Sequence, residues 1–135
     1  EPFGVAILDV DEFKEINDQH GHLRGDEILK EVAQALKRAV RVSDCVARFG
    51  GDEFVILFSG APNEEVILDR LRREIKDCVT TLSIGTAFCP KDGTTGDELI
   101  SAADNRMYEA KIEKTGKKTR SGHCTREETF VPSTL

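Results

Sequence analysis

Apolar residues fall into four short runs that are typical of β-strands. Phe3–Leu8 is a nearly continuous run, which predicts a strand covered on both faces. Cys45–Phe49 and Phe54–Phe58 are separated by the four residues Gly50–Glu53. This spacing predicts a hairpin in which the glycines adopt positive φ. Thr80–Phe88 alternates between apolar and polar positions and predicts a fourth strand.

Three other segments have the period of amphipathic helices. The longest begins at Asp26, the second opens after Pro62, and the third starts at Thr95–Glu98, which matches a capping box. A short helix and a loop fit the polar segment between Asp11 and Arg24. The apolar faces predicted for the three longer helices are Ile28, Leu29, Val32, Ala33, Leu36 and Val40; Val66, Ile67, Leu71 and Ile75; and Leu99, Ala103, Met107 and Ala110.

The elements therefore follow the order strand, helix, strand, strand, helix, strand, helix. A hairpin between two strand–helix units predicts a ferredoxin-like α+β fold, with a mostly antiparallel sheet flanked by helices. The length of 135 residues suits one domain. The polar tail from Thr115 has no clear pattern, and a last edge strand near residues 117–121 is one option.

Composition and charge exclude several classes of protein. The net charge of −6 argues against a nucleic-acid binder, because such proteins usually carry a basic excess. No apolar run approaches the ~20 residues of a membrane helix, and we find no signal peptide. The four cysteines lack C-x-x-C spacing, so a zinc site is not expected. Cys45 and Cys78 have apolar neighbours and are interpreted as reduced core thiols of a cytoplasmic protein.

Three carboxylates could meet at one edge of such a sheet. Asp9 follows the first strand, while Asp52 and Glu53 occupy the tip of the hairpin. Carboxylates gathered in this way repel one another unless a cation lies between them, and Mg²⁺ binds through a few carboxylates plus substrate phosphates. Two such ions could assist an in-line displacement at phosphorus. The alternative is that Asp52 and Glu53 only solvate a turn.

Several motifs resemble those of the GGDEF domain family. Arg48-Phe-Gly-Gly-Asp-Glu-Phe54 is the sequence that names the family, and Asp9-Val-Asp-Glu-Phe-Lys-Glu-Ile-Asn-Asp18 resembles its motif D-x-D-x-F-K-x-I-N-D. Gly21-His-x-x-Gly-Asp26, Leu82-Ser-Ile-Gly85 and Ala103-Asp-x-x-Met-Tyr-x-Ala-Lys111 match further motifs. The resemblance implies a nucleotidyl-cyclase palm-like domain over residues 1–118, followed by a tail over residues 119–135.

The resemblance also implies roles for individual residues in diguanylate cyclase chemistry. Asp9 and Asp52 would hold the metals, two Mg²⁺ or Mn²⁺ per active half-site, assisted by the carbonyl of Val10 and the carboxylate of Glu53. Asp52 would also be the base for the attacking 3′-hydroxyl. The phosphates would meet Lys14 and the amides around Glu12 and Phe13, which open a short helix.

Other residues would bind the rest of the nucleotide. Asn17 and Asp26 would recognise guanine, whose N1–H and N2–H donors adenine lacks, and His22 either borders the same pocket or lies on the surface. Family members commonly continue A-K-x-x-G-R-N, where the Lys and Arg reach phosphates. This chain instead continues Ala110-Lys-Ile-Glu-Lys-Thr-Gly-Lys-Lys118. Lys111 would keep the phosphate role and Lys117 would replace the arginine. Lys114, Lys117 and Lys118 could otherwise be a solvated basic helix end.

A second, regulatory site is implied by Arg41-Val-Ser-Asp44, which fits the family motif R-x-x-D. In the family this motif marks a product-inhibition site for cyclic di-GMP, to which Arg70 would add a further arginine. Such a motif also arises by chance on charged helix ends.

The function implied is a homodimeric diguanylate cyclase that condenses two GTP into cyclic di-GMP and two pyrophosphates. The alternatives are a catalytically silent GGDEF domain that senses GTP or cyclic di-GMP, or a metal-binding or scaffold domain without nucleotide. The chain lacks the D-x-L-T-G-L-x-N-R-like segment that family members carry upstream of the Asp9 position. We therefore expect a piece truncated at its N-terminus, from a longer protein with a regulatory sensor domain.

Overall fold

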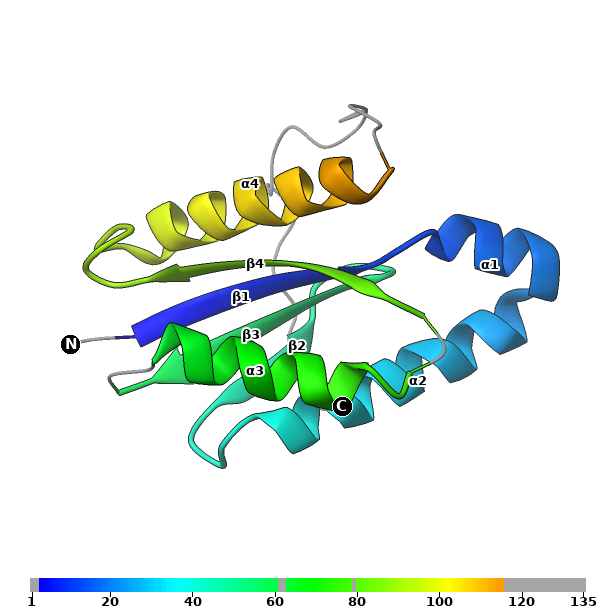
Figure 1. The fold of residues 1–135 in the computed structure, drawn as a ribbon, viewed down its shortest axis with the longest axis horizontal. Helices are drawn as coiled ribbons and strands as arrows, with labels where there is room; N and C mark the ends of the chain where they lie inside the picture. Colours follow the sequence, from blue (N-terminus) through cyan, green and yellow to red (C-terminus); the bar gives the residue numbers. More distant parts are fainter. Residues whose placement is uncertain (1–2, 61–62, 79, 116–135) are drawn as a thin grey trace.

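The computed structural model of the chain describes residues 3–60, 63–78 and 80–115. These residues form one antiparallel sheet in the order β2-β3-β1-β4 (Figure 1). The helices and strands are β1 (Phe3–Val10), α1 (Phe13–His20), α2 (His22–Ala39), β2 (Cys45–Arg48), β3 (Glu53–Ser59), α3 (Glu64–Ile75), β4 (Leu82–Phe88) and α4 (Gly96–Thr115). This order confirms the predicted ferredoxin-like α+β fold.

Helices cover both faces of the sheet. In Figure 1, α4 lies on one side of the strands, while α2 and α3 lie on the other. The core under α4 joins Val5 and Ile7 of β1 to Leu99, Ala103 and Met107 of α4. The larger core on the opposite face packs strand residues against the apolar stripes of α2 and α3. β1 is therefore covered on both faces, as its continuous apolar run predicts.

Two helices begin with the caps that their sequences encode. The amide of Glu98 donates to the Thr95 hydroxyl, and the Glu98 carboxylate accepts from the Thr95 amide, so the predicted capping box forms at the start of α4. Asn63 caps α3 by accepting from the amide of Val66.

Gly85 lets α4 approach β4 closely. A Cβ atom built on Gly85 would lie 1.9 Å from the Ala103 carbonyl oxygen and 2.3 Å from the Met107 amide nitrogen. Because both neighbours are backbone atoms of the helix, no side-chain movement could make room. The contact explains why the strand carries a glycine at its centre.

The structure differs from the sequence predictions at the junction of α1 and α2. Helix α2 begins at His22 and not at Asp26, so residues 22–24 are helical and do not form a loop. Gly21, with φ of 86°, ends α1, and its amide donates a hydrogen bond to the Asn17 carbonyl. The Gly21 carbonyl then accepts from the Gly25 amide and starts α2. Because the first turn of α2 is mostly polar, apolar periodicity does not indicate that it is helical.

Three further expectations need correction. β1 extends to Val10, because Asp9 still pairs with strands on both sides. Cys45 is exposed on the edge strand β2 and is no core residue, whereas Cys78 does pack against the core. Val66 is 47% exposed, because the core-facing stripe of α3 consists of Ile67, Leu71 and Ile75. The strand considered near residues 117–121 lies outside the described residues.

None of the helices in the described part of the chain has the length and apolar character that crossing a bilayer would require.

Candidate active site

Asp9 lies where three strands meet. It stands opposite Glu53 in the β1–β3 pairing and opposite Ser83 in the β1–β4 pairing. The next amide, that of Val10, donates to the carbonyl of Asp52 at 3.0 Å. The structure thus brings Asp9, Asp52 and Glu53 to the same end of the sheet, as the topology of the sequence predicts.

The electrostatics of Asp9 are unusual for a carboxylate. Burial, and then the nearby charge of Asp52, raise the pKa of Asp9 to about 7. The opposing influence is Lys111 of α4, whose ammonium group lies 2.7 Å from Asp9 Oδ2. Burial would lower the pKa of Lys111, but its pairing with Asp9 raises that pKa above its ordinary value. A second cation near this carboxylate pair would be electrostatically favourable.

The carboxylate oxygens around Asp9 fit a magnesium ion that also binds to the oxygens of a phosphorylated ligand. Oδ1 of Asp9 is buried and accepts no hydrogen bond from the described residues. Among those residues, no group of three or more His, Cys, Asp or Glu side chains is arranged as a ready-made metal cage. Mg²⁺ usually binds through only one or two carboxylates and completes its octahedron with water and phosphate oxygens. The Asp9–Asp52 pair therefore fits this ion when a phosphorylated ligand supplies the remaining oxygens.

The hairpin that carries Asp52 is held by Arg48. Its guanidinium donates to the carbonyls of Gly50 and Gly51, at 2.8 Å for the shortest bond. Neither Gly50 nor Gly51 has a positive φ, so the expectation that these glycines adopt one is wrong. A Cβ on Gly51 would meet no atom within 4 Å, so the glycine leaves open space beside the loop. Sequence analysis placed Arg48 in the motif but gave it no role.

The start of α1 offers backbone amides next to this hairpin. Glu12 adopts a left-handed conformation, with φ of 56°, and its side chain makes no cap hydrogen bond. A non-glycine residue in this conformation is uncommon and is often found at functional sites. Lys14 is exposed, while Phe13 is half-buried and packs against the core. The arrangement is suited to an anion at the helix N-terminus.

Asn17 and Asp26 flank the junction of α1 and α2. Oδ1 of Asn17 is buried, accepts no hydrogen bond from the described part of the chain, and lies where a Cβ on Gly25 would clash with it. Asp26 borders a groove of about 490 Å³ between α2 and the hairpin strands, and His22 is exposed. The groove is lined by Asp26, Leu29, Lys30, Ala33, Gln34, Arg48 and Phe54.

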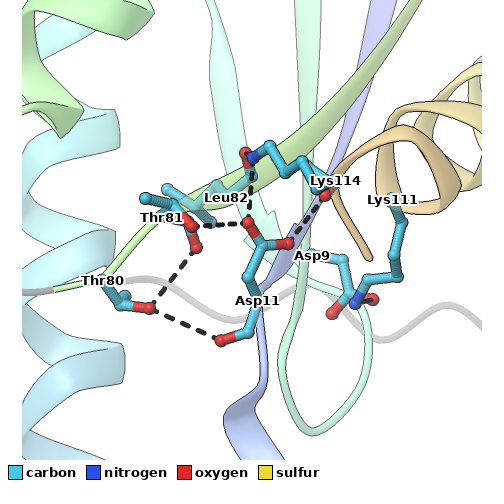
Figure 2. A network of polar contacts seen from close by, with 8 residues as sticks. Asp9, Asp11, Thr80, Thr81, Leu82, Lys111 and Lys114 are labelled. Atoms are coloured by element: carbon cyan, nitrogen blue, oxygen red, sulfur yellow. Dashed lines mark hydrogen bonds and ion pairs between the residues drawn. The ribbon is translucent and has the colours of Figure 1, made fainter. Parts of the chain in front are cut away.

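Asp11 forms a buried polar network that sequence analysis missed (Figure 2). It is 8% exposed and accepts hydrogen bonds from Thr81 at 2.6 Å and Ser83 at 2.7 Å. The ammonium group of Lys114 lies 2.9 Å from its carboxylate. Burial would raise the pKa of Asp11, but these donors together lower it below its ordinary value. The interpretation of Lys114 as purely solvated is therefore wrong, while Lys117 and Lys118 lie outside the described residues.

Arg41 and Asp44 pair with each other in this structure. Two guanidinium nitrogens of Arg41 lie 3.2 Å from the two oxygens of Asp44, whose side chain is 2% exposed. Burial would raise the pKa of Asp44, but the hydrogen bonds from Arg41 and Ser59 lower it. Arg41 itself is 46% exposed and can meet a ligand, whereas the oxygens of Asp44 are already occupied. No hydrogen bond or ion pair among the described residues joins Arg70 to this pair.

A four-stranded antiparallel sheet with carboxylates at the end of β1 and on the β2–β3 hairpin defines a palm-like α+β domain. The family described as "Diguanylate cyclase, GGDEF domain" matches residues 1–117, and the chain belongs to this family.

Three comparisons illustrate this membership. The diguanylate cyclase DosC of Escherichia coli (strain K12) is 42% identical over 122 residues, covering 82% of this chain but 26% of DosC. An EAL/GGDEF domain protein from M. capsulatus has a TM-score of 0.77 at 39% identity, covering 84% of this chain and 80% of that one. The GGDEF domain of DgcB from Caulobacter crescentus, solved with c-di-GMP, has a TM-score of 0.71 at 28% identity, covering 86% and 74%. The chain thus spans about a quarter of the length of the first of these relatives.

Proposed function

We propose that this chain is the catalytic domain of a diguanylate cyclase. The observation that carries the proposal is the pair of carboxylates Asp9 and Asp52 at the end of β1, where burial and then the charge of Asp52 raise the pKa of Asp9 to about 7. Like charges kept together in this way disfavour the metal-free site and favour a bound cation. In a chain of the GGDEF family, the cation expected there is Mg²⁺ or Mn²⁺ with GTP.

Different residues of the chain would bind the metal ions and the phosphate groups of the ligand. Asp9, the carbonyl of Val10, Asp52 and Glu53 would hold two divalent ions in each half-site. These ions would neutralise phosphate charge during displacement at the α-phosphorus. The phosphate groups would lie against the first amides of α1, near Glu12 and Phe13, with Lys14, Lys111 and Lys117 as counter-charges.

The guanine base would occupy the region of Asn17 and Asp26. Oδ1 of Asn17, which has no hydrogen-bond partner in the described part of the chain, supplies an acceptor, and the carboxylate of Asp26 can accept from both N1–H and N2–H of guanine. Adenine lacks this donor pair, so the site would favour GTP. His22 is exposed beside these residues and could border the base.

The reaction would need two copies of the chain. Each would bind one GTP, with the two nucleotides facing each other in a homodimer. The 3′-oxygen of one GTP attacks the α-phosphorus of the other, the bond to pyrophosphate breaks, and Asp52 accepts the 3′-hydroxyl proton. Repeating this step in the other direction closes cyclic di-GMP and releases the second pyrophosphate.

Regulation would come from outside this domain and from the product. A sensor domain in the full-length protein would control how two copies meet. Arg41, assisted by Asp44 and Arg70, would bind cyclic di-GMP away from the hairpin. Because the oxygens of Asp44 already accept hydrogen bonds from Arg41 and Ser59, Asp44 would act mainly by orienting the Arg41 guanidinium.

The test is incubation with GTP and Mg²⁺, followed by chromatography of the products. The chain is assayed alone and fused at its N-terminus to a dimeric parallel coiled coil, which raises the effective concentration of the second copy. Cyclic di-GMP from either form supports the proposal. Binding of a non-hydrolysable GTP analogue without product, in both forms, would identify the silent sensor instead. The absence of both binding and product would refute the nucleotide site altogether.

A further inference from the structure

Asp9 of β1, Asp11 directly after this strand, and two lysines of α4 form successive ion pairs. Asp9 pairs with Lys111 at 2.7 Å, and Asp11 pairs with Lys114 at 2.9 Å (Figure 2). The two carboxylates are only two residues apart in the chain, and residues three apart in a helix are neighbours on its surface. The two pairs therefore lie side by side between the end of β1 and the end of α4.

The two carboxylates differ in what they can still bind. Both oxygens of Asp11 accept hydrogen bonds, Oδ1 from Ser83 and Oδ2 from Thr81 and Lys114. Asp9 keeps one buried oxygen with no donor among the described residues. Both oxygens of Asp11 therefore have hydrogen-bond partners, one of which is Lys114, whereas Asp9 has an oxygen that can still bind a ligand.

Lys114 joins α4 to two strands at once. Besides pairing with Asp11, which directly follows β1, its ammonium group donates to the Leu82 carbonyl of β4. About two turns earlier in α4, Arg106 donates to the Thr86 carbonyl at 2.7 Å and to Asp92 at 2.9 Å. Helix α4 is therefore tied to β4 at residues 106 and 114, and Lys111 lies between these two ties.

We propose that Lys114 is a positioning residue for the active site. By bridging Asp11 and the Leu82 carbonyl, it fixes the end of α4 so that the Lys111 ammonium group is held at Asp9. The inference rests on the proposed function in one respect, namely that Lys111 and Asp9 belong to the nucleotide site. Helix ends fray and lysine side chains have many rotamers, so without this tie Lys111 would sample positions away from Asp9.

The first experiment observes Lys111 directly, without metal or nucleotide. ¹H–¹⁵N NMR of lysine ammonium groups detects those held in ion pairs, and Lys111→Met assigns the signal of Lys111. We expect Lys114→Met to abolish or broaden this signal, and Lys114→Arg, which keeps a cation there, to restore it. Lys37→Met, on the exposed last turn of α2, is the matched control and should leave the signal unchanged. An unaltered Lys111 signal in Lys114→Met would overturn the proposal.

The second experiment asks whether Lys114 acts through Lys111. We expect Lys114→Met to lower kcat/KM by about tenfold to about 100-fold, the range for small misplacements of a site group. In the Lys111→Met background the same substitution should cause no further loss. Full additivity of the two substitutions would refute action through Lys111. Lys114→Gln replaces Lys114→Met if the latter fails to fold. If neither the chain nor its coiled-coil fusion makes product, the proposed function fails, but the NMR result still decides the role of Lys114.

Discussion

Lys111 and Asp9 are 102 positions apart in the chain, and their side chains meet at 2.7 Å. This contact joins the last helix to the first strand at the point where the carboxylates gather. It explains how a buried aspartate beside Asp52 can persist in the folded chain, since a half-buried lysine offsets part of the repulsion. The predictions below follow from this arrangement and from the sites around it.

Asp52→Asn should abolish product formation and leave the fold intact. The substitution removes a negative charge that would hold the metal and accept the 3′-hydroxyl proton, while the shape of the hairpin is retained. Chromatography of the products and a thermal unfolding scan measure the two effects. Asp97→Asn, on the exposed first turn of α4, serves as the control. Wild-type turnover in Asp52→Asn would contradict the assignment.

Asp9→Asn should stabilise the metal-free protein, increasingly as the pH rises. The folded-state pKa of Asp9 is about 7, above its ordinary value of 3.8. The folded chain therefore binds more protons, and its stability falls as the pH rises from about 4 to about 7. Asparagine removes this dependence, so the variant should gain a few kcal/mol near pH 8, at about 1.4 kcal/mol per pKa unit. Urea unfolding of both proteins with a chelator, between pH 5 and pH 8, measures the difference. A constant difference across this range would argue against a buried, charged Asp9.

Asp26→Ser should relax the preference for GTP over ATP. Serine cannot accept from both guanine donors, and unpaired buried donors cost about 1–3 kcal/mol. The ratio of kcat/KM for GTP to that for ATP should fall by about tenfold to about 100-fold. Glu27→Ser changes the adjacent exposed residue, whose only described partner is Arg24, and should leave the ratio unchanged. Equal rates for both nucleotides in the parent chain would exclude the guanine site.

Arg41→Ala should weaken cyclic di-GMP binding and leave the binding of a GTP analogue nearly unchanged. Losing one charge-assisted contact costs about 1.5–3 kcal/mol. Arg38→Ala is the control, because Arg38 is also an exposed arginine near the end of α2, paired with Glu74. Calorimetric titration with both ligands gives the two affinities. Equal cyclic di-GMP affinity in Arg41→Ala and the parent would make the R-x-x-D match a chance pairing, and the site would be withdrawn.

Gly85→Ala should destabilise the fold. The added methyl group would meet backbone atoms of Ala103 and Met107 at less than 2.5 Å, and forcing extra atoms into a packed core costs about 1–3 kcal/mol or more. Gly96→Ala is the matched control, because a Cβ there meets nothing within 4 Å. The free energies of unfolding in urea measure both effects. Similar stability of the two variants would indicate that α4 does not pack on β4 as described.

The sequence predicts the order of the elements because apolar period, capping residues and turn residues are local signals. The hairpin, the capping box of Thr95 and Glu98, and the meeting of Asp9 with the hairpin all follow from such signals and from topology. Contacts between distant polar residues leave no local trace. Asp11 and Lys114, for example, can be recognised as partners only once α4 lies on β1.

Local sequence patterns also failed to predict the backbone conformation near the hairpin. The residue beside the hairpin that adopts a left-handed conformation is Glu12, although glutamate does not favour this conformation. Gly50 and Gly51 lack a positive φ, although glycine readily adopts one. A glycine is compatible with a turn, with open space or, as at Gly85, with the close approach of another element, and only the neighbouring atoms distinguish these cases.

The long separation between Asp9 and Lys111 also has a consequence for the order of events on the ribosome. The first strand emerges early, but the lysine that balances its carboxylate is synthesised close to the C-terminal end of the domain. A nascent chain that stops short of residue 111 would have to bury Asp9 without this counter-ion, or leave the strand undocked. The charged corner of the sheet thus disfavours a stable partial domain until α4 has been made.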